Sequence, residues 1–157
     1  MTLLVPMTPD EFSVFMDEAV PAFAAEKIAS GQWTHEEAFD LSRKAFDELL
    51  PQGLASPDNF LFSLRDRDGR AGIGWIWIAV QERAGRRIGY VYDVVIAPEH
   101  QRKGHATRAF LALEDEVRAR GLSGIALHVF GHNAAARALY TKLGYEPTNI
   151  NLFKSVD

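Results

Sequence analysis

A short run of cationic and small residues, Gln101-Arg102-Lys103-Gly104-His105-Ala106, has the chemistry of an anion-binding turn. An apolar, β-branched segment precedes the run and an amphipathic segment follows it, so we predict that the run opens a helix. The first N–H groups of a helix have no partner within the helix, and the aligned peptide dipoles add partial positive charge there. Gly104 lets a ligand approach the main chain, while Arg102 and Lys103 contribute cations. The run therefore predicts a pocket for a pyrophosphate.

Two flanking elements must position this turn. Residues 88–96 are rich in β-branched and aromatic side chains, which predicts a strand, and Pro98 ends it because proline has no backbone N–H. A helix is predicted from the turn to Gly121, since glycine is typical of helix C-termini. The inner face of this helix consists of apolar residues at helical spacing: Ala106, Ala109, Phe110, Leu113 and Val117.

A second block of sequence supplies an amide and a phenol at helical spacing. It runs from a strand predicted over residues 125–130 into a helix predicted from Asn133 to Gly144. Asn133 and Tyr140 are seven residues apart, which is two helical turns, so both lie on one face of that helix. Asn133 is equally suited to capping the helix, and Tyr140 to packing on the sheet. A role in binding or proton transfer has to be weighed against these structural roles.

Together, the two blocks resemble the GNAT (Gcn5-related N-acetyltransferase) superfamily. The loop pattern of that family is Arg or Gln, two residues, Gly, one residue, and then Gly or Ala, which Gln101, Gly104 and Ala106 match. The resemblance implies an α/β fold with a mixed, mostly antiparallel central sheet flanked by helices, in the order β-α-α-β-β-β-α-β-α-β. It also implies that the sheet opens between the strands ending at Ile96 and Phe130, and that acetyl-CoA enters there.

The resemblance further implies that an amine attacks the thioester of acetyl-CoA directly, with no acyl-enzyme. It places the main chain of Val94, Val95 and Ile96 along the pantetheine arm, which Asn133 also contacts. Tyr140 would act as the general acid that returns a proton to the CoA thiolate. The diphosphate would be bound by the turn: Gln101, Arg102, Lys103, Gly104, His105, Ala106 and Thr107. His105 stands where the family usually has an apolar residue, and the sequence assigns it no role.

The general base is left open by the sequence. Asp93 is the first choice, because some sugar-phosphate acetyltransferases of the family carry a carboxylate at this place. Glu26 and Tyr90 are alternatives, as is deprotonation through water. Glu26 and Trp33 are expected to line the acceptor pocket, since the family shapes that pocket at the break between its first helices. The stretch from Ala24 to Leu54 is also similar to an uncharacterised bacterial subgroup of the family.

The remaining elements follow from apolar periodicity and from capping patterns. Pro21 should kink or split the first helix. Trp75 and Trp77 share one face of an apolar strand and are expected in the core. The predicted elements are a strand at 3–5, helices from Thr8 to about Ser30 and from Thr34 to Leu50, strands at 61–64 and 75–80, and terminal strands from Tyr145 and residues 151–153.

Composition limits the classes of protein to consider. A chain of 157 residues with 47% apolar residues fits a single domain, residues 1–157. The net charge of −4 provides no basic field for nucleic acid, and the absence of cysteine excludes disulfides, thiolate metal sites and a cysteine nucleophile. The chain lacks a long apolar segment, so we expect a soluble, cytoplasmic protein without membrane contact.

Two weaker signals are discounted, and the functional alternatives are kept. His128 and His132 flank a strand end rather than share a helix, so no metal is expected, and the glycines at 69, 72 and 74 lie in a hairpin without a phosphate-binding helix. The expected function is acetyl transfer from acetyl-CoA to a primary amine of a small molecule or peptide. The alternatives are a non-catalytic acyl-CoA sensor and transfer of a longer acyl group. A homodimer is possible, because members of the family often form dimers.

Overall fold

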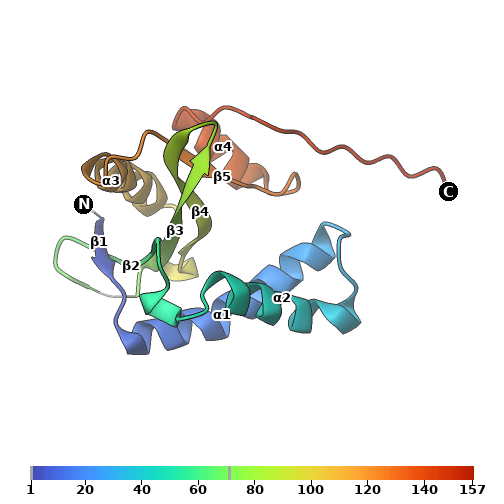
Figure 1. Cartoon of the computed structure of the whole chain (residues 1–157), viewed down its shortest axis with the longest axis horizontal. Coiled ribbons are helices and arrows are strands. Elements are labelled where there is room, and N and C mark those ends of the chain that lie inside the picture. The colour runs from blue at the N-terminus through green and yellow to red at the C-terminus, as the bar shows by residue number, and fades with distance from the viewer. Residues whose placement is uncertain (1, 71) are drawn as a thin grey trace.

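A five-stranded sheet in the order β1-β2-β3-β4-β5 forms the centre of the molecule (Figure 1). The computed structural model describes residues 2–70 and 72–157. Neighbouring strands pair antiparallel except β4 and β5, which are parallel, so the predicted mixed, mostly antiparallel sheet is confirmed. The strands are β1 (Leu3–Pro6), β2 (Asn59–Arg65), β3 (Gly74–Arg83), β4 (Arg86–Ile96) and β5 (Ile125–Leu127).

Helices cover both faces of this sheet. One pair follows β1 and forms a hairpin, and the other pair flanks β5 in the sequence (Figure 1). None of the helices in the described ranges is long and apolar enough to cross a membrane. The helices are α1 (Pro9–Ala29), α2 (His35–Leu49), α3 (His105–Ala119) and α4 (Ala134–Lys142), with short 3₁₀ turns η1 (Gly53–Ala55) and η2 (Pro98–His100).

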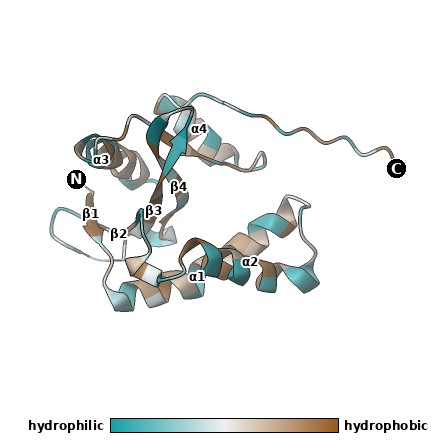
Figure 2. Cartoon of the chain, in the orientation of Figure 1, coloured by the Kyte–Doolittle hydropathy of each residue, from teal (hydrophilic) through white to brown (hydrophobic). Residues whose placement is uncertain are grey.

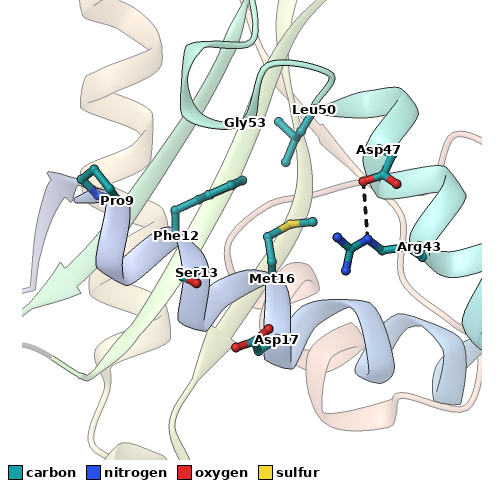
Figure 3. A pocket seen from close by; sticks show the side chains of 9 residues that line it. All are labelled: Pro9, Phe12, Ser13, Met16, Asp17, Arg43, Asp47, Leu50 and Gly53. Atoms are coloured by element: carbon teal, nitrogen blue, oxygen red, sulfur yellow. Dashed lines mark ion pairs between the residues drawn. The ribbon is translucent and has the colours of Figure 1, made fainter.

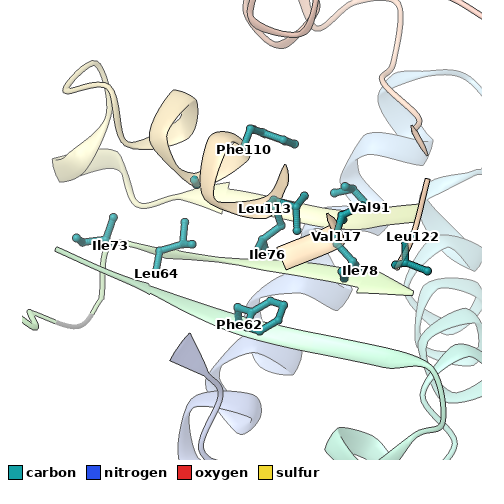
Figure 4. Packing of buried hydrophobic residues seen from close by; sticks show 11 residues of the cluster. Phe62, Leu64, Ile73, Ile76, Ile78, Val91, Phe110, Leu113, Val117 and Leu122 are labelled. Atoms are coloured by element: carbon teal, nitrogen blue, oxygen red, sulfur yellow. The ribbon is translucent and has the colours of Figure 1, made fainter. Parts of the chain in front are cut away.

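Side chains on alternate strand positions build two separate cores, one on each face of the sheet. The first lies between the sheet and α3, with α4 packed at its margin (Figure 4). It is made of aliphatic and phenylalanine side chains: Phe62, Leu64, Ile73, Ile76, Ile78, Val91, Ala109, Phe110, Leu113, Val117 and Leu122. The apolar face predicted for the helix after the turn therefore points into this core.

The second core lies between the opposite face of the sheet and the α1–α2 hairpin, and it is rich in aromatic rings. The Trp77 side chain is fully buried there, and its ring stacks on that of Tyr92 with centroids 4.6 Å apart. The Phe15 ring meets the Trp75 and Trp77 rings edge to face, at centroid distances of 5.4 and 6.1 Å. The prediction of core packing is confirmed for Trp77, whereas Trp75 is only partly buried and packs against the margin of this core.

Helix α1 begins where the sequence predicts and passes Pro21 without interruption. The Glu11 N–H donates to the Thr8 hydroxyl and the Thr8 N–H donates to the Glu11 carboxylate, at 3.2 and 3.0 Å. This reciprocal capping satisfies N–H groups that the helix leaves free. The expectation that Pro21 splits the helix in two is wrong, because packing of Val20 and Ala24 on either side of it holds the helix together.

The C-terminal part of the chain differs from the expected order of elements. β5 ends at Leu127 rather than at Phe130, and neither of the predicted terminal strands, from Tyr145 and over residues 151–153, is formed. Residues 146–157 instead run away from the sheet as an extended chain (Figure 1). A strand exists only where a neighbouring edge accepts its hydrogen bonds, and no such backbone bond from this segment occurs in the described part of the chain.

Leu113 and Leu111 test the inner face of α3. Leu113 is fully buried, so we expect Leu113→Ala to lower the free energy of unfolding by about 2–5 kcal/mol, from lost burial and the cavity left behind. Leu111 is 50% exposed, and Leu111→Ala should change the free energy by less than about 0.5 kcal/mol. Urea unfolding followed by circular dichroism measures both, and equal losses would contradict this orientation of the helix.

Candidate functional site

The sheet opens where β5 diverges from β4. The parallel pairing joins Gly89–Val91 of β4 to Ile125–Leu127 of β5 and then stops. β4 continues to Ile96 while remaining paired with β3 on its other side. Within the described residues, the main-chain groups of residues 92–96 that point away from β3 therefore have no partner strand. Val94, Val95 and Ile96, predicted to offer their main chain to a ligand, line this opening.

A β-bulge in β4 lies at the mouth of the opening. Val91 pairs with Ile78 and Asp93 pairs with Trp77, which leaves Tyr92 as the additional residue. The bulge turns Asp93 toward Trp75, whose indole Nε1–H donates to the Asp93 carboxylate at 2.8 Å. Sequence reasoning placed Trp75 in the core and missed this contact, since a bulge shifts which residues share a face.

Burial raises the pKa of Asp93 above its ordinary value, against the opposing effect of hydrogen bonds from Trp75 and from the Val94 backbone. A carboxyl group in this environment can accept a proton nearer neutral pH than an exposed one. Burial also raises the pKa of Tyr90, which makes its phenol a poorer base at neutral pH. Between these two candidates, the electrostatics favour Asp93.

The predicted anion-binding turn ends at a helix N-terminus that no side chain of the described residues caps. α3 begins after Gly104, which adopts a left-handed conformation with φ +82°, and no hydrogen bond from a side chain closes this end. α1 and α4, in contrast, are capped by Thr8 and Asn133. The first N–H groups of α3, at His105, Ala106 and Thr107, are thus available to an anion.

Exposed cations stand beside these N–H groups. Arg102 and Lys103 are both exposed, and Arg102 has a positive φ of 62°. A non-glycine residue in this conformation is uncommon and points to a constrained turn. The Gln101 side chain donates its amide N–H to the Ile96 carbonyl at 3.0 Å, so it fastens the turn to the end of β4.

Hydrogen bonds behind the turn give a structural role to His105, to which the sequence assigned none. Its Nδ1 lies 3.0 Å from the hydroxyl of Thr2, a buried residue at the start of the chain. Burial and the positive charge of Arg108 lower the pKa of His105 and favour its neutral form. The Arg108 guanidinium in turn donates to the Lys103 carbonyl at 2.8 Å. Sequence reasoning missed Thr2 and Arg108 as supports of the turn.

Asn133 and Tyr140 occupy the structural roles that the sequence left open, and each keeps a polar group without a hydrogen-bond partner among the described residues. The Asn133 Oδ1 accepts the Ala136 N–H at 3.2 Å as an N-cap, which leaves its amide NH₂ to donate. The Tyr140 ring packs edge to face on Phe110, with centroids 5.3 Å apart. Burial and the nearby Asp93 carboxylate raise the pKa of Tyr140 to about 12, so its phenol is protonated at neutral pH.

A contact between Glu26 and His132 links α1 to the loop after β5. The Glu26 carboxylate lies 2.9 Å from the His132 Nε2, and both side chains are partly exposed. The contact brings Glu26 from the α1–α2 hairpin to the loop that leads to Asn133. Trp33, in contrast, packs edge to face on Phe23 at 5.6 Å, with the Lys27 ammonium 5.3 Å from its ring. The sequence offered no sign of the Glu26–His132 pair, because the residues are 106 positions apart.

One hollow of the described surface lies away from this opening. It measures about 470 Å³ and lies between α1, α2 and η1, with Phe12, Met16 and Leu50 as its apolar part (Figure 3). The Arg43 guanidinium lies 3.5 Å from the Asp47 carboxylate at its rim. None of the residues predicted for the site lines this hollow. In the described ranges, no group of three or more His, Asp or Glu side chains is arranged to hold a metal ion.

Comparison with known proteins gives consistent matches along the chain. The model of the acetyltransferase (GNAT) family matches residues 22–145. The chain is 33% identical over 154 residues to the uncharacterised N-acetyltransferase YycN of Bacillus subtilis (strain 168), covering 98% of each chain. It is also 33% identical over 153 residues to YdgE of the same organism, covering 98% of this chain and 97% of YdgE.

Solved structures agree in fold. The crystal structure of YycN superposes with a TM-score of 0.94 over 99% of both chains, at 33% identity. A predicted acetyltransferase of Clostridium acetobutylicum, crystallised with acetyl-CoA, has a TM-score of 0.63 and 19% identity, covering 99% of this chain and 97% of that one. At that identity the second likeness shows the fold alone.

Asp93 should reduce stability at neutral pH. Because its pKa is raised in the folded state, the stability that depends on the protonated carboxyl is complete below the unfolded pKa, near 3.8, and is lost as the pH rises through the folded pKa. Asp93→Asn stays neutral and keeps an oxygen for the Trp75 indole. We expect the variant to melt at a higher temperature than the parent at pH about 7.5, with the difference closing toward pH about 4. Thermal unfolding over this range checks it, and a less stable variant at neutral pH would contradict the cost of burying the charge.

Proposed function

The chain belongs to the GNAT family of acetyltransferases, and from this premise we propose that it transfers the acetyl group of acetyl-CoA directly to a primary amine of a small molecule or peptide. One observation carries the proposal: the unpaired part of β4 leads from a buried carboxylate to the uncapped N-terminus of α3. This arrangement suits a long ligand with an anionic end and a reactive end.

The anionic end is assigned to the turn. The diphosphate would accept hydrogen bonds from the first N–H groups of α3, at His105, Ala106 and Thr107, with Arg102 and Lys103 alongside. The pantetheine arm carries amide groups, which can pair with the main chain of residues 94–96 as a strand would. The free amide NH₂ of Asn133 supplies one further donor.

The reactive end is assigned to Asp93 and Tyr140. The amine nitrogen forms a bond to the thioester carbon as the C–S bond breaks, and a main-chain N–H of Val95 or Ile96 stabilises the developing oxyanion. Asp93, with its raised pKa, takes the proton that the amine loses, directly or through water. Tyr140 donates a hydrogen bond to the departing thiolate.

The pKa values decide how the proton reaches sulfur. A phenol with a pKa of about 12 does not give up its proton readily to a thiolate, since alkyl thiols have pKa values near 8.5. Proton transfer from Tyr140 to the thiolate becomes favourable when the protonated Asp93 or solvent returns a proton to the Tyr140 oxygen. The charge of Asp93 contributes to the raised pKa of Tyr140, which supports this coupling. The proton removed from the amine then ends on CoA.

The acceptor is assigned to the α1 side of the opening. Glu26 is partly exposed there and is held by His132. A carboxylate at this place attracts an ammonium group and is available as a second acceptor for its proton. Trp33 remains a candidate for the outer wall, where its ring packs with Phe23 and Lys27.

Gly104 and Gly121 test the diphosphate site as a matched pair. A Cβ at Gly104 would lie 2.6 Å from the Arg108 Nη1 at a φ of +82°, whereas Gly121, with φ +72°, has open space around it. Both Gly→Ala changes carry the cost of a left-handed alanine, about 1–2 kcal/mol. Gly104→Ala should weaken acetyl-CoA binding about tenfold or more, equivalent to about 1.4 kcal/mol, and Gly121→Ala less than about twofold. Isothermal titration calorimetry measures both, and equal affinities would place the diphosphate elsewhere.

Tyr140→Phe tests the acid. We expect turnover to fall about 100-fold, the usual contribution of a general acid, while the affinity for acetyl-CoA is retained. Tyr145→Phe is the control, because the Tyr145 hydroxyl is buried without a hydrogen-bond partner in the described residues and its loss should leave turnover unchanged. CoA released in a screen of amines can be followed with a thiol reagent, since the chain contains no cysteine. Binding of acetyl-CoA without CoA release from any amine would favour a non-catalytic sensor.

A further inference from the structure

The hairpin between β3 and β4 carries two arginines that no carboxylate of the described residues neutralises. Arg83, the last residue of β3, pairs directly across the hairpin with Arg86, the first residue of β4. The two-residue turn Ala84-Gly85, with φ of 50° and 77°, fixes this register. Like charges directly opposite each other destabilise a sheet, and neither arginine is among the ion pairs of the described chain. An anion bound between them would relieve this repulsion.

Uncharged groups hold both guanidinium groups in place. Arg86 donates from Nε to the Ser123 hydroxyl at 3.2 Å and from Nη2 to the Ser123 carbonyl at 3.3 Å. The Arg83 guanidinium lies over the Tyr90 ring, 5.1 Å from its centroid, and donates to the Gln81 side-chain carbonyl at 3.3 Å. Because a guanidinium has five N–H donors, most donors of both groups remain available to a ligand.

Both arginines line a hollow of about 350 Å³ at the hairpin end of the sheet (Figure 1). In Figure 2, β3 and β4 become hydrophilic toward this end. Ile88 of β4 and Ala126 of β5 form an apolar part of the lining, and Thr148 adds a hydroxyl. Two cations beside a hydroxyl suit a small anionic group better than a large apolar one.

The hollow and Tyr90 lie on the same face of the sheet. Residues two apart in a strand share a face, so Arg86, Ile88 and Tyr90 point to one side of β4. Ala126 pairs with Tyr90 and belongs to the same side, whereas Val91 points into the core under α3. The hollow is therefore on the side of the sheet against which the α1–α2 hairpin packs.

A row of partly exposed rings on this face leads from the hollow to Asp93. Tyr90 belongs to neither core, and its ring meets the Tyr92 ring with centroids 4.8 Å apart. The Gln81 amide donates to the Tyr92 hydroxyl at 3.0 Å and fixes the second ring. Asp93 pairs with Trp77, whose ring stacks on Tyr92, so the carboxylate lies on the same face as both tyrosines.

The length of this row determines which molecules can reach both of its ends. Asp93 follows Ile88 by five positions, so at about 3.3 Å per residue the ends lie about 15 Å apart. An extended peptide of four residues has this length, since each residue spans about 3.3–3.6 Å. Carboxylates at one end suit an amine, and guanidinium groups at the other suit an anion.

Building on the proposed acetyl transfer, we propose that the acceptor is a peptide-like amine whose nitrogen lies at Asp93 and whose anionic group, about 15 Å away, binds between Arg83 and Arg86. The anionic group is a carboxylate or a phosphate, both of which accept paired N–H donors from guanidinium. The rings of Tyr90 and Tyr92 pack against the middle of the acceptor. Amines that lack the anionic group, or are too short to reach it, bind more weakly.

The first test compares tetra-alanine carrying a C-terminal carboxylate with its C-terminal amide. Isothermal titration calorimetry in the presence of CoA, which has no acetyl group to transfer, measures binding apart from turnover. We expect the acid to bind about tenfold more tightly than the amide, equivalent to about 1.4 kcal/mol. Dialanine is too short, and its acid and amide should differ by less than about twofold. Equal affinities of the two forms of tetra-alanine would overturn the proposal.

A pair of double substitutions locates the anion. Arg83→Gln/Arg86→Gln should reduce the preference for the acid to less than about twofold. Arg67→Gln/Arg87→Gln is the control, because it removes the same charge at exposed residues outside the hollow, and Arg87 stands opposite Glu82 in the hairpin. The control should keep the preference, and circular dichroism shows that both variants are folded. A preference that survives the first pair, or is lost equally in both, would contradict binding between the two arginines.

Two further measurements identify the anion and separate this proposal from acetyl transfer itself. Ala-Ala-Ala-phosphoserine amide carries a phosphate in place of the carboxylate, and tighter binding than the acid would assign the two arginines to phosphate. CoA release from acetyl-CoA with tetra-alanine tests the transfer. Acid binding that depends on both arginines, without CoA release, would support the anion site and contradict transfer to this acceptor. CoA release with equal KM values for acid and amide would overturn the anion site alone.

Discussion

The candidate site depends on how short the parallel pairing between β4 and β5 is. Only Gly89–Val91 and Ile125–Leu127 are joined, after which β4 continues for five residues beside β3 alone. Main-chain groups left unpaired at the centre of a protein are costly unless a ligand or water satisfies them. The sheet therefore contains, in its own hydrogen-bond pattern, a slot that an extended ligand with amide groups can complete, and α3 begins at the far end of that slot.

The bulge at Tyr92 positions Asp93, which we propose as the general base, and it does so at a cost in stability. Without the additional residue, Asp93 would fall on the register of its neighbours and would not meet the Trp75 indole in the same way. A carboxylate held beside an indole and partly removed from water is less stable when ionised, which is the condition for a base that works near neutral pH. Stability and reactivity oppose one another at this residue.

Local chemistry explains what could be predicted from the sequence. The turn at residues 101–106 was predicted because glycine, cations and a following amphipathic helix are neighbours in the chain, and the cores were predicted from strand and helix periods. Contacts between distant residues were not predictable in this way. Thr2 with His105, Trp75 with Asp93 and Glu26 with His132 depend on the bulge and on loop paths that no local pattern encodes.

The terminal strand that did not form shows the same limit of prediction from local sequence patterns. The sequence predicted a strand at residues 151–153 and that prediction is wrong, because a strand also needs an edge, and an edge is a property of the assembled sheet. β5 has only three residues paired to β4, so its position depends on what lies along its outer side. β5 is also one wall of the slot. Because so few hydrogen bonds hold β5 to β4, the contacts along the outer side of β5 also set the width of the opening.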